Sequence, residues 1–320
     1  DENIGEMESQ GIEFQADAVL SRRPLHIKST FNFTYNQSEV LEVGEQGFLF
    51  LPNGILEEGQ PIGVWFGYEQ AGVWQSQAEI DEAIDLGFVG QHGIDASTLQ
   101  PGHTRFVDQI TVDTDGDGVL DSGDGIIDAN DRVRLGQSRP DFTGGFFNRF
   151  TWKGLSLNIG LQYSFGAKIF NENRIGFEQG RGFPNQTANT ASRWSPDLFT
   201  YDPNNPEEKT LAREGSLNNT YRIVGAPVET QLIDRYIENG DFIRLSDLAL
   251  AYNLPKKLLS NLNIEGLRVY ITGHNLFIWS NYSGYDPEVS TGSFRALLPG
   301  LDSNAYPRSR TIILGLNVTL

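Results

Sequence analysis

The stretch of the sequence best suited to chemistry is an acidic loop of twelve residues, from Asp113 to Asp124. Carboxylates occupy positions 1, 3, 5, 9 and 12 of this loop, glycine stands at position 6, and the residue at position 7 offers a backbone carbonyl. This spacing is typical of loops that wrap oxygen ligands around Ca²⁺, because the glycine allows the sharp turn. The predicted calcium ligands are Asp113, Asp115, Asp117, Val119, Asp121 and Asp124.

The same residues could instead form an acidic turn that holds no metal. Carboxylates packed closely without a cation would repel one another, which favours the metal. Position 12 is Asp124 rather than a glutamate, so its reach as a bidentate ligand is shorter. The flanking residues are strand-like, so the loop is not an EF-hand, and the ion would hold a loop in shape. The acidic residues from Asp124 to Asp131 could complete this site or supply a second one.

No other pattern in the sequence indicates catalysis, and we do not expect an enzyme. The four histidines are scattered, no Gly-x-Ser-x-Gly or phosphate-binding glycine loop occurs, and no two carboxylates are marked as an acid–base pair. Aromatic residues in predicted loops could stack on sugar rings, although loop packing and the lipid interface are their more frequent roles. These aromatic residues are Trp65, Trp74, Trp194 and Tyr285.

Composition narrows the class of protein. The 320 residues include 42 acidic and 24 basic side chains, for a formal net charge of −18, which argues against nucleic-acid binding. Cysteine is absent, which excludes disulfides and thiolate chemistry. The sequence begins with Asp1 rather than methionine and shows no leader pattern, so we expect a mature product or, preferably, a fragment of a longer chain.

Long alternating runs are the strongest structural signal. Residues Leu155 to Phe165 alternate apolar and polar side chains over eleven positions. Strands of soluble proteins average about 5–6 residues, whereas a tilted membrane strand needs about 9–11. Similar alternation predicts further strands at 11–20, 25–35, 146–152, 241–253, 267–279 and 312–320. The apolar and aromatic run at 61–74 predicts one more strand, and residues 132–145, which include Gly144-Gly145, are expected to form a turn. The pattern therefore favours an all-β protein of the transmembrane antiparallel β-barrel type.

The connections between these strands are unequal in length. We predict eight or nine strands, joined alternately by tight turns such as Lys153-Gly154 and by long loops, an asymmetry typical of outer-membrane barrels. A short helix is expected at 76–86, with Ser76 as its N-cap and Glu79 completing a capping box. The loops, which we expect to be extracellular, cover about 37–60, 75–142, 171–240 and 280–307.

Several short blocks together resemble the C-terminal part of SusC/RagA-type TonB-dependent outer-membrane transporters. Each block is weak alone, but their order and spacing are specific, and they cover nearly the whole chain. The blocks are Asn3-Ile4-Gly5-Glu6 with Gly11-Ile12-Glu13, the acidic loop leading to Asp131-Arg132 and Leu135-Gly136, Arg193-Trp194, Glu238-Asn239-Gly240-Asp241-Phe242-Ile243-Arg244-Leu245, Leu250-Ala251-Tyr252-Asn253-Leu254-Pro255, Leu267-Arg268-Val269-Tyr270, Asn275-Leu276-Phe277, Tyr282-Ser283-Gly284-Tyr285-Asp286-Pro287-Glu288, and Tyr306-Pro307 to Leu320.

The resemblance implies a function as well as a fold. Such transporters have a barrel of about 22 strands around an N-terminal plug, lie in the outer membrane, and are capped by a SusD-like surface lipoprotein. They import oligosaccharides or peptides with energy relayed by TonB. The resemblance implies that residues 1–320 are C-terminal barrel strands with their long loops, and that the plug and the segment that contacts TonB lie elsewhere. The family commonly ends in phenylalanine, where this chain has Leu320.

Two alternatives from other classes remain at this stage. One is a secreted, calcium-stabilised β-sandwich that acts as an adhesin or carbohydrate-binding module, and it would need strands of about six residues. The other is a β-rich glycoside hydrolase, which would need two carboxylates facing each other across a cleft. The length of the strand at Leu155 to Phe165 favours the barrel over the sandwich.

Overall fold

The computed structural model describes residues 5–22, 24–178, 185–202, 205–222, 232–260, 264–294 and 296–320. Its largest part is a seven-stranded antiparallel sheet in the order β1-β2-β12-β13-β18-β19-β21, so neighbours in the sheet follow one another along the chain. The strands of this sheet are β1 (Gly5–Ser21), β2 (His26–Val43), β12 (Phe142–Trp152), β13 (Leu155–Phe165), β18 (Phe242–Asn253), β19 (Gly266–Ser280) and β21 (Thr311–Thr319).

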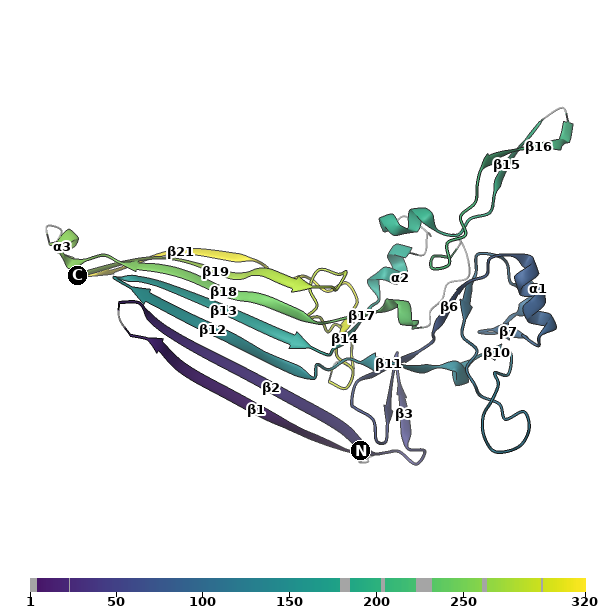
Figure 1. The fold of residues 1–320 in the computed structure, drawn as a ribbon, viewed down its shortest axis with the longest axis horizontal. Helices are drawn as coiled ribbons and strands as arrows, with labels where there is room; N and C mark the ends of the chain where they lie inside the picture. Colours follow the sequence, from purple (N-terminus) through teal and green to yellow (C-terminus); the bar gives the residue numbers. More distant parts are fainter. Residues whose placement is uncertain are drawn as a thin grey trace.

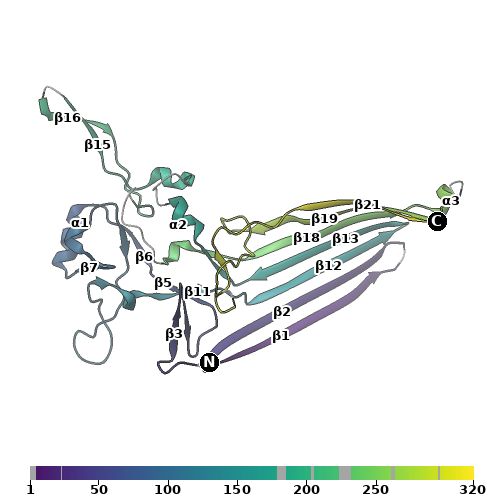
Figure 2. The ribbon, with the colours of Figure 1, turned by 180° about the vertical axis from the view of Figure 1, so that it is seen from behind.

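Smaller elements gather at one end of this sheet, as Figures 1 and 2 show. We call this the rim end, the opposite end the turn end, and the described residues within 44–141, 166–241 and 281–310 the cap. The cap strands are β3 (Phe48–Leu51), β4 (Gly54–Glu57), β5 (Val64–Gly67), β6 (Gln70–Val73), β7 (Gly90–Gln91), β8 (Ile94–Asp95), β9 (Thr104–Phe106), β10 (Ile126–Ile127), β11 (Val133–Gln137), β14 (Lys168–Asn171), β15 (Leu198–Asp202), β16 (Asn205–Arg213), β17 (Ile237–Asn239) and β20 (Leu301–Asp302). The α-helices are α1 (Gln77–Asp85) and α2 (Asn173–Glu178) in the cap and α3 (Lys256–Leu259) at the turn end, and short 3-10 helices cover Ala96–Thr98, Ala129–Asp131, Ala188–Ser192 and Asp234–Tyr236.

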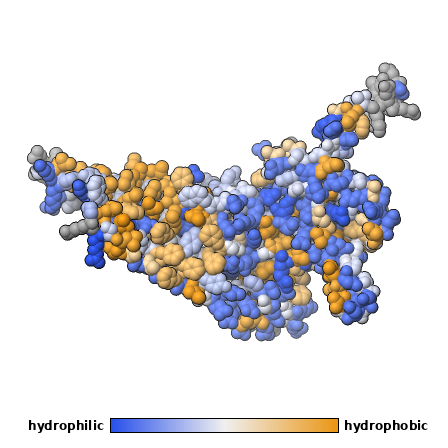
Figure 3. All heavy atoms as spheres, in the orientation of Figure 1, coloured by the Kyte–Doolittle hydropathy of each residue, from blue (hydrophilic) through white to orange (hydrophobic). Residues whose placement is uncertain are grey.

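The two faces of the seven-stranded sheet differ in polarity. Phe31 lies opposite Phe146, which lies opposite Leu161, and directly paired residues of an antiparallel sheet share a face. Apolar side chains gather over the sheet, whereas the cap surface is mostly hydrophilic (Figure 3). An exposed apolar band of this kind is the lipid-facing side of a membrane barrel. The opposite face carries mainly polar side chains, among them Thr30, Asn32, Arg149, Asn158 and Gln162.

The structure confirms the barrel-type strands that the alternation predicts. Strand β13 spans Leu155–Phe165, the full eleven-residue run, and Lys153-Gly154 forms the turn before it with positive φ at both residues. The β1–β2 hairpin is present at the predicted place. The sheet is open, with β1 and β21 as its edges, and Figures 1 and 2 show no second sheet of described residues packed on either face. The strands of this sheet are also longer than the about six residues that the β-sandwich alternative would need.

Several predicted boundaries are wrong. Seven strands of the described chain form the sheet, not eight or nine, because the aromatic run at 61–74 forms the short cap strands β5 and β6. The region 37–60 is not an irregular loop, since β2 continues to Val43 and β3 pairs with β4. The last strand ends at Thr319, which leaves Leu320 outside it and 86% exposed.

Gly144 and Gly145, which we predicted as a turn, lie inside β12. The ring of Tyr163 lies over Gly144, where a β-carbon would overlap it, and its hydroxyl donates to the carbonyl of Asn32 at 3.0 Å. On the other face, Gly315 lies under the ring of its cross-strand partner Tyr270 in the same way. Aromatic rings that cover glycines restore packing that glycine alone would lose in a strand.

A β-bulge corrects the predicted faces of β18. The sequence pattern places Phe242 and Arg244 on one face with Leu248, but Ser246 is skipped in the pairing with both neighbouring strands. One extra residue reverses the alternation, so Arg244 points to the polar face whereas Leu248 points to the apolar one. The bulge thereby places a buried arginine at the rim end.

One apolar core ties the three cap insertions together. Trp65 from the first insertion, Phe170 and Ile233 from the second, and Leu298 from the third all belong to it and are at most 4% exposed. The indole of Trp65 also donates to the carbonyl of Lys168 at 2.9 Å. The cap is therefore a folded unit rather than a set of independent loops.

Helix α1 begins as predicted at Ser76, whose hydroxyl accepts the backbone N–H of Glu79 at 3.2 Å. The carboxylate of Glu79 accepts from the backbone of Gln75 rather than of Ser76, so the capping box is displaced by one residue. No helix in the described residues is long and apolar enough to cross a membrane.

Candidate functional site: the rim of the sheet

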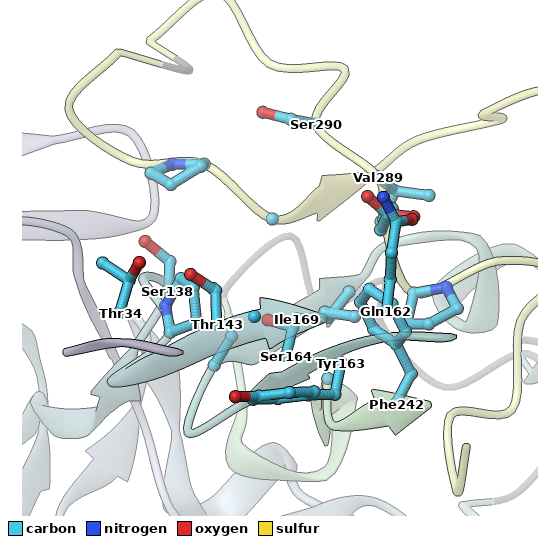
Figure 4. A pocket seen from close by; sticks show the side chains of 18 of the residues that line it. Thr34, Ser138, Thr143, Gln162, Tyr163, Ser164, Ile169, Phe242, Val289 and Ser290 are labelled. Carbon is cyan, nitrogen blue, oxygen red and sulfur yellow. The ribbon is translucent and has the colours of Figure 1, made fainter. Parts of the chain in front are cut away.

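A hollow of about 760 Å³ lies at the rim end, between the polar face of β2, β12 and β13 and the segment from 287 to 308 (Figure 4). Its floor carries hydroxyl and amide groups from three neighbouring strands, because alternate residues of each strand point to the polar face. Val289 and Ser290 lie across the hollow from this floor. The polar floor residues are Asn32, Thr34, Thr143, Gln162 and Ser164.

A chain of ion pairs fixes the segment that covers this hollow. The guanidinium of Arg244 lies 2.7 Å from a carboxylate oxygen of Asp286 and 2.8 Å from one of Glu288. Glu288 also contacts Arg308 at 3.2 Å. The side chains of Arg244 and Asp286 are only 4% and 7% exposed. Each charge has therefore lost most of its hydration, and the opposite charge beside it compensates for that loss. The geometry therefore holds residues 286–308 against the sheet.

A second polar cluster joins α2 to β17 and to the segment after β19. Arg174 lies 2.8 Å from Glu178 and 3.2 Å from Glu238, and Glu238 also accepts from the hydroxyl of Ser283 at 2.7 Å. Burial, followed by the hydrogen bond that its hydroxyl donates to Asp302, raises the pKa of Tyr282. That hydroxyl is therefore a permanent donor at neutral pH.

The acidic loop lies in the cap, and the structure brings three of its carboxylates together. One oxygen each of Asp113, Asp115 and Asp117 lies within 4.8 Å of the others. The backbone N–H groups of Gly118 and Gly116 donate to Asp113 at 2.8 and 2.7 Å and lower its pKa, so it is ionised at neutral pH. Hard, anionic oxygen donors at this spacing suit Ca²⁺.

The other predicted ligands do not join this cluster through the contacts that the structure shows. Asp121 accepts from the backbone and hydroxyl of Thr114 at 3.0 and 2.6 Å, and Asp124 accepts from the backbone of Ile126 at 2.8 Å. Val119 donates its N–H to Asp117 at 2.8 Å. The carboxylates at positions 1, 3 and 5 thus gather, while those at 9 and 12 hold the ends of the loop.

Residues further along this acidic segment have structural roles. Asp131 is 1% exposed and accepts from the backbone of Gln109 and Asp128 at 2.8 and 2.7 Å, which caps a 3-10 helix. Three of the four aromatic residues considered for sugar stacking are buried: Trp65, Trp74 and Trp194 are at most 6% exposed. Their rings pack in the cap and are not available to a ligand.

Comparison with known proteins supplies the wider context. The chain is 28% identical over 332 aligned residues to a TonB-dependent receptor of Formosa agariphila, with 99% of this chain and 29% of the relative covered. It is 24% identical to the TonB-dependent receptor SusC of Bacteroides thetaiotaomicron, covering 99% of this chain and 27% of the relative. A solved structure of the RagAB peptide transporter matches 99% of this chain and 30% of its own with a TM-score of 0.69 at 24% identity. No protein-family model matches the chain.

Over 99% of its length the chain is therefore similar to TonB-dependent receptors that include SusC, and its fold is similar to that of the RagAB transporter. It spans about 30% of the length of the relatives that it matches. Proteins of this type are outer-membrane β-barrels, which accounts for the apolar outer face and polar inner face of the sheet. The relatives are transporters and receptors rather than enzymes.

Some functional features of this chain cannot be predicted from the sequence. The pairing of Arg244 with Asp286 joins residues 42 positions apart, and neither the bulge nor the fold of the cap follows from local pattern. One signal was available: the block from Tyr282 to Glu288 carries two carboxylates among small and aromatic residues. Carboxylates that are buried in a loop need a specific cationic or hydrogen-bonding partner from another part of the chain.

Proposed function

We propose that this chain forms part of the wall and outer rim of an outer-membrane importer for nutrients. The observation that carries the proposal is the combination of membrane-length strands, apolar outside and polar inside, with a folded cap that overhangs the polar face. The remaining strands of the barrel would pair with β1 and β21, the two edges of the open sheet. The cap would face the exterior, and transport would draw on energy delivered through TonB.

A SusD-like surface lipoprotein is the proposed partner at the cap. The cap is the part of the chain that would face such a lid. The surface of the cap is mostly hydrophilic (Figure 3), which suits a contact that forms and separates repeatedly. The cargo class would be an oligosaccharide or a peptide, since relatives include SusC and the RagAB peptide transporter. Lipid of the outer membrane would surround the apolar face.

Uptake measured in the native host tests this function. Deleting the gene for the intact receptor should abolish uptake of one nutrient class from a panel of labelled oligosaccharides and peptides, and depleting TonB should have the same effect. A tagged intact receptor should co-purify with a surface lipoprotein from detergent extracts. Unchanged uptake across the whole panel, or a full-length protein that stays monodisperse without detergent, would refute the proposal.

We further propose that Asp113, Asp115 and Asp117 hold a structural Ca²⁺, with Val119, Asp121 and Asp124 completing its surroundings in the bound state. The three gathered carboxylates support this, because their mutual repulsion needs a cation or solvent to offset it. The ion would fix the loop and perform no chemistry.

Calcium binding to the intact receptor tests this site. Calorimetric titration should show Ca²⁺ binding that Asp113→Asn together with Asp115→Asn removes, while Asp85→Asn, an exposed carboxylate of α1, leaves it unchanged. Chelation should speed hydrogen exchange in 113–124 and leave the barrel strands protected. Equal calcium binding by the double variant would exclude the assignment.

A further inference from the structure

The lipid-facing band of the sheet ends, at the turn end, in a row of cross-strand partners. Trp152 lies opposite Leu155, Leu155 lies opposite Tyr252, and Tyr252 lies opposite Val269. These four side chains are between 36% and 46% exposed on the apolar face. Aromatic rings at the border of such a band lie at the level of the lipid headgroups, because each has an apolar body and a polar edge. The row therefore marks where headgroups meet this part of the wall.

Basic side chains gather just beyond this row. The connections between strands at the turn end are 22–25, 153–154 and 254–265. Their described basic residues are Arg22, Lys153, Lys256 and Lys257. Glu265 is the one acidic residue that the structure describes there, although the chain as a whole has a formal net charge of −18. None of the three lysines forms an ion pair with a described residue, so their charges are available to an anion that approaches this end.

The backbone brings two of these connections side by side. The N–H of Asn253 donates to the carbonyl of Gly154 at 2.9 Å, so the turn of Lys153 lies directly beside the segment that leads into α3. The ammonium of Lys153 lies 5.0 Å from the centre of the Trp152 ring. This cation–π contact holds the charge at the border of the apolar band.

Helix α3 combines positive charge with an apolar contact. Lys256 and Lys257 are exposed, and Leu258 beside them is 65% exposed, whereas Leu259 is 2% exposed and attaches the helix to the end of the sheet. An exposed leucine at a membrane surface enters the headgroup layer, while neighbouring ammonium groups stay at the level of the phosphates. The arrangement fits a ligand that is anionic at one end and apolar at the other.

The opposite border of the same face carries the reverse charge. Near the rim end Glu6 lies opposite Glu42 and Glu8 lies opposite Glu39, and Glu8 shares the face of Ile12. Carboxylates repel the phosphate of an anionic lipid, whereas ammonium groups attract it. Of the two described borders of the lipid-facing band, the one at the turn end therefore suits an anionic headgroup.

We propose that Lys153, Lys256 and Lys257 bind the phosphate of an anionic phospholipid whose acyl chains lie along Trp152 and Tyr252. These three lysines are called the lysine site. In the orientation proposed for the importer the short turns face the periplasm, so this lipid belongs to the inner leaflet of the outer membrane. The inference rests on that orientation and goes beyond the import function, because it concerns the wall of the barrel and not the cargo.

Lipid titration of the intact receptor in a neutral detergent tests the lysine site. The probes are dihexanoyl phosphatidylglycerol, which is anionic, and dihexanoyl phosphatidylcholine, which is zwitterionic, and native mass spectrometry measures their binding. Lys256→Gln with Lys257→Gln should weaken the tightest binding of phosphatidylglycerol about 25-fold, and Lys153→Gln about five-fold, since each basic residue near an anionic lipid surface contributes a factor of about five. Phosphatidylcholine binding should change little.

Two further variants control this experiment. Lys153→Arg keeps the positive charge and should retain binding of phosphatidylglycerol. Arg213→Gln removes an exposed basic residue of the cap, far along the chain from the turn end, and should leave lipid binding unchanged. The heat-dependent shift of the folded barrel on gels confirms that each variant has assembled before its binding is compared.

The outcomes decide the assignment. Phosphatidylglycerol binding that falls in the lysine-to-glutamine variants and persists in Lys153→Arg and Arg213→Gln supports the lysine site. Unchanged binding in the glutamine variants overturns it, and so does an equal loss of both lipids, which would show contact through the acyl chains alone. Displacement of the lipid by inorganic phosphate at the same concentration would show a site for the free ion and overturn the lipid assignment.

Lysine labelling of intact cells separates this inference from the import proposal. A reagent that does not cross the outer membrane should leave Lys153, Lys256 and Lys257 unmodified. Modification of these lysines would place the turn end outside the cell and contradict the orientation of the proposed importer. Unmodified lysines together with unchanged lipid binding in the glutamine variants would show that the lysine site is wrong while the import function stands.

Discussion

Removing the guanidinium of Arg244 should loosen one segment of the cap and spare the barrel wall. In Arg244→Met the carboxylate of Asp286, which is 7% exposed, would remain buried without its cation. Leaving one partner of a buried ion pair in this way costs about 3–5 kcal/mol. Because Arg244 joins the sheet to Asp286 and Glu288, whereas Leu298 and β20 are held by other contacts, the cost should fall on residues 286–290.

Hydrogen exchange of the intact receptor in detergent measures this effect. A loss of about 3–5 kcal/mol in the local opening free energy corresponds to exchange that is faster by roughly 10² to 10³-fold or more in residues 286–290. Amides of β12 and β13 should stay protected. Arg308→Met is the matched control: its side chain is 50% exposed and it contacts Glu288, so its loss should cost under about 1 kcal/mol.

A double variant separates buried charge from lost packing. Arg244→Met with Asp286→Leu removes both charges, and apolar replacement of a buried pair is often close to neutral. It should therefore recover much of the protection that Arg244→Met loses. If Arg244→Met exchanges no faster than Arg308→Met, or if the double variant is as loose as the single one, the ion pair does not hold this segment.

Three further changes test other parts of the structure. Gly315→Leu should reduce the fraction of receptor that assembles into a barrel, because a side chain there overlaps the ring of Tyr270 and overpacking costs about 1–3 kcal/mol. Gly266→Ala is the control, since a β-carbon there meets only ordinary contacts. The heat-dependent shift of the folded barrel on gels measures the assembled fraction of both variants. Burial lowers the pKa of both His92 and His103, so the folded cap binds fewer protons than the unfolded chain and should lose stability as pH falls below about 6.5. Amide exchange from pH 8 to 5.5 should show this loss in the wild type and a smaller loss in His92→Gln, which keeps His103. Ser76→Ala should speed amide exchange in α1, because the helix loses about 1 kcal/mol of N-cap stabilisation. An unchanged exchange rate would show that the tertiary packing of the helix outweighs its cap.

Local pattern was sufficient for the strands that lie in a uniform environment. Leu155 to Phe165 has lipid on one side and a polar interior on the other, so its period of two is unbroken and its ends were predicted correctly. The same logic located the β1–β2 hairpin and the N-cap of α1. Family resemblance added the identity of the barrel because its blocks recur in a specific order.

The rim required the folded structure. Whether Arg244 points inward depends on the bulge at Ser246, two residues further along the chain. The pair Gly144-Gly145 is typical of a turn, and only the placement of the Tyr163 ring over Gly144 explains it within a strand. A cavity beside α2, lined by Asn171, Phe177, Tyr285 and Tyr306 among others, is assembled from four separate segments of the chain. None of these follows from neighbours in sequence.

The division has a simple physical reason. By itself the sequence determined the strands of unbroken alternation, such as β13, with their apolar and polar faces, and the membrane-type fold, because those depend on the period of side chains along one strand and on the medium that each face meets. The tertiary structure alone decided the buried pair of Arg244 with Asp286 and the aromatic cavity above Asn171. Those depend on contacts between residues far apart in the chain, which only the folded cap brings within hydrogen-bonding distance.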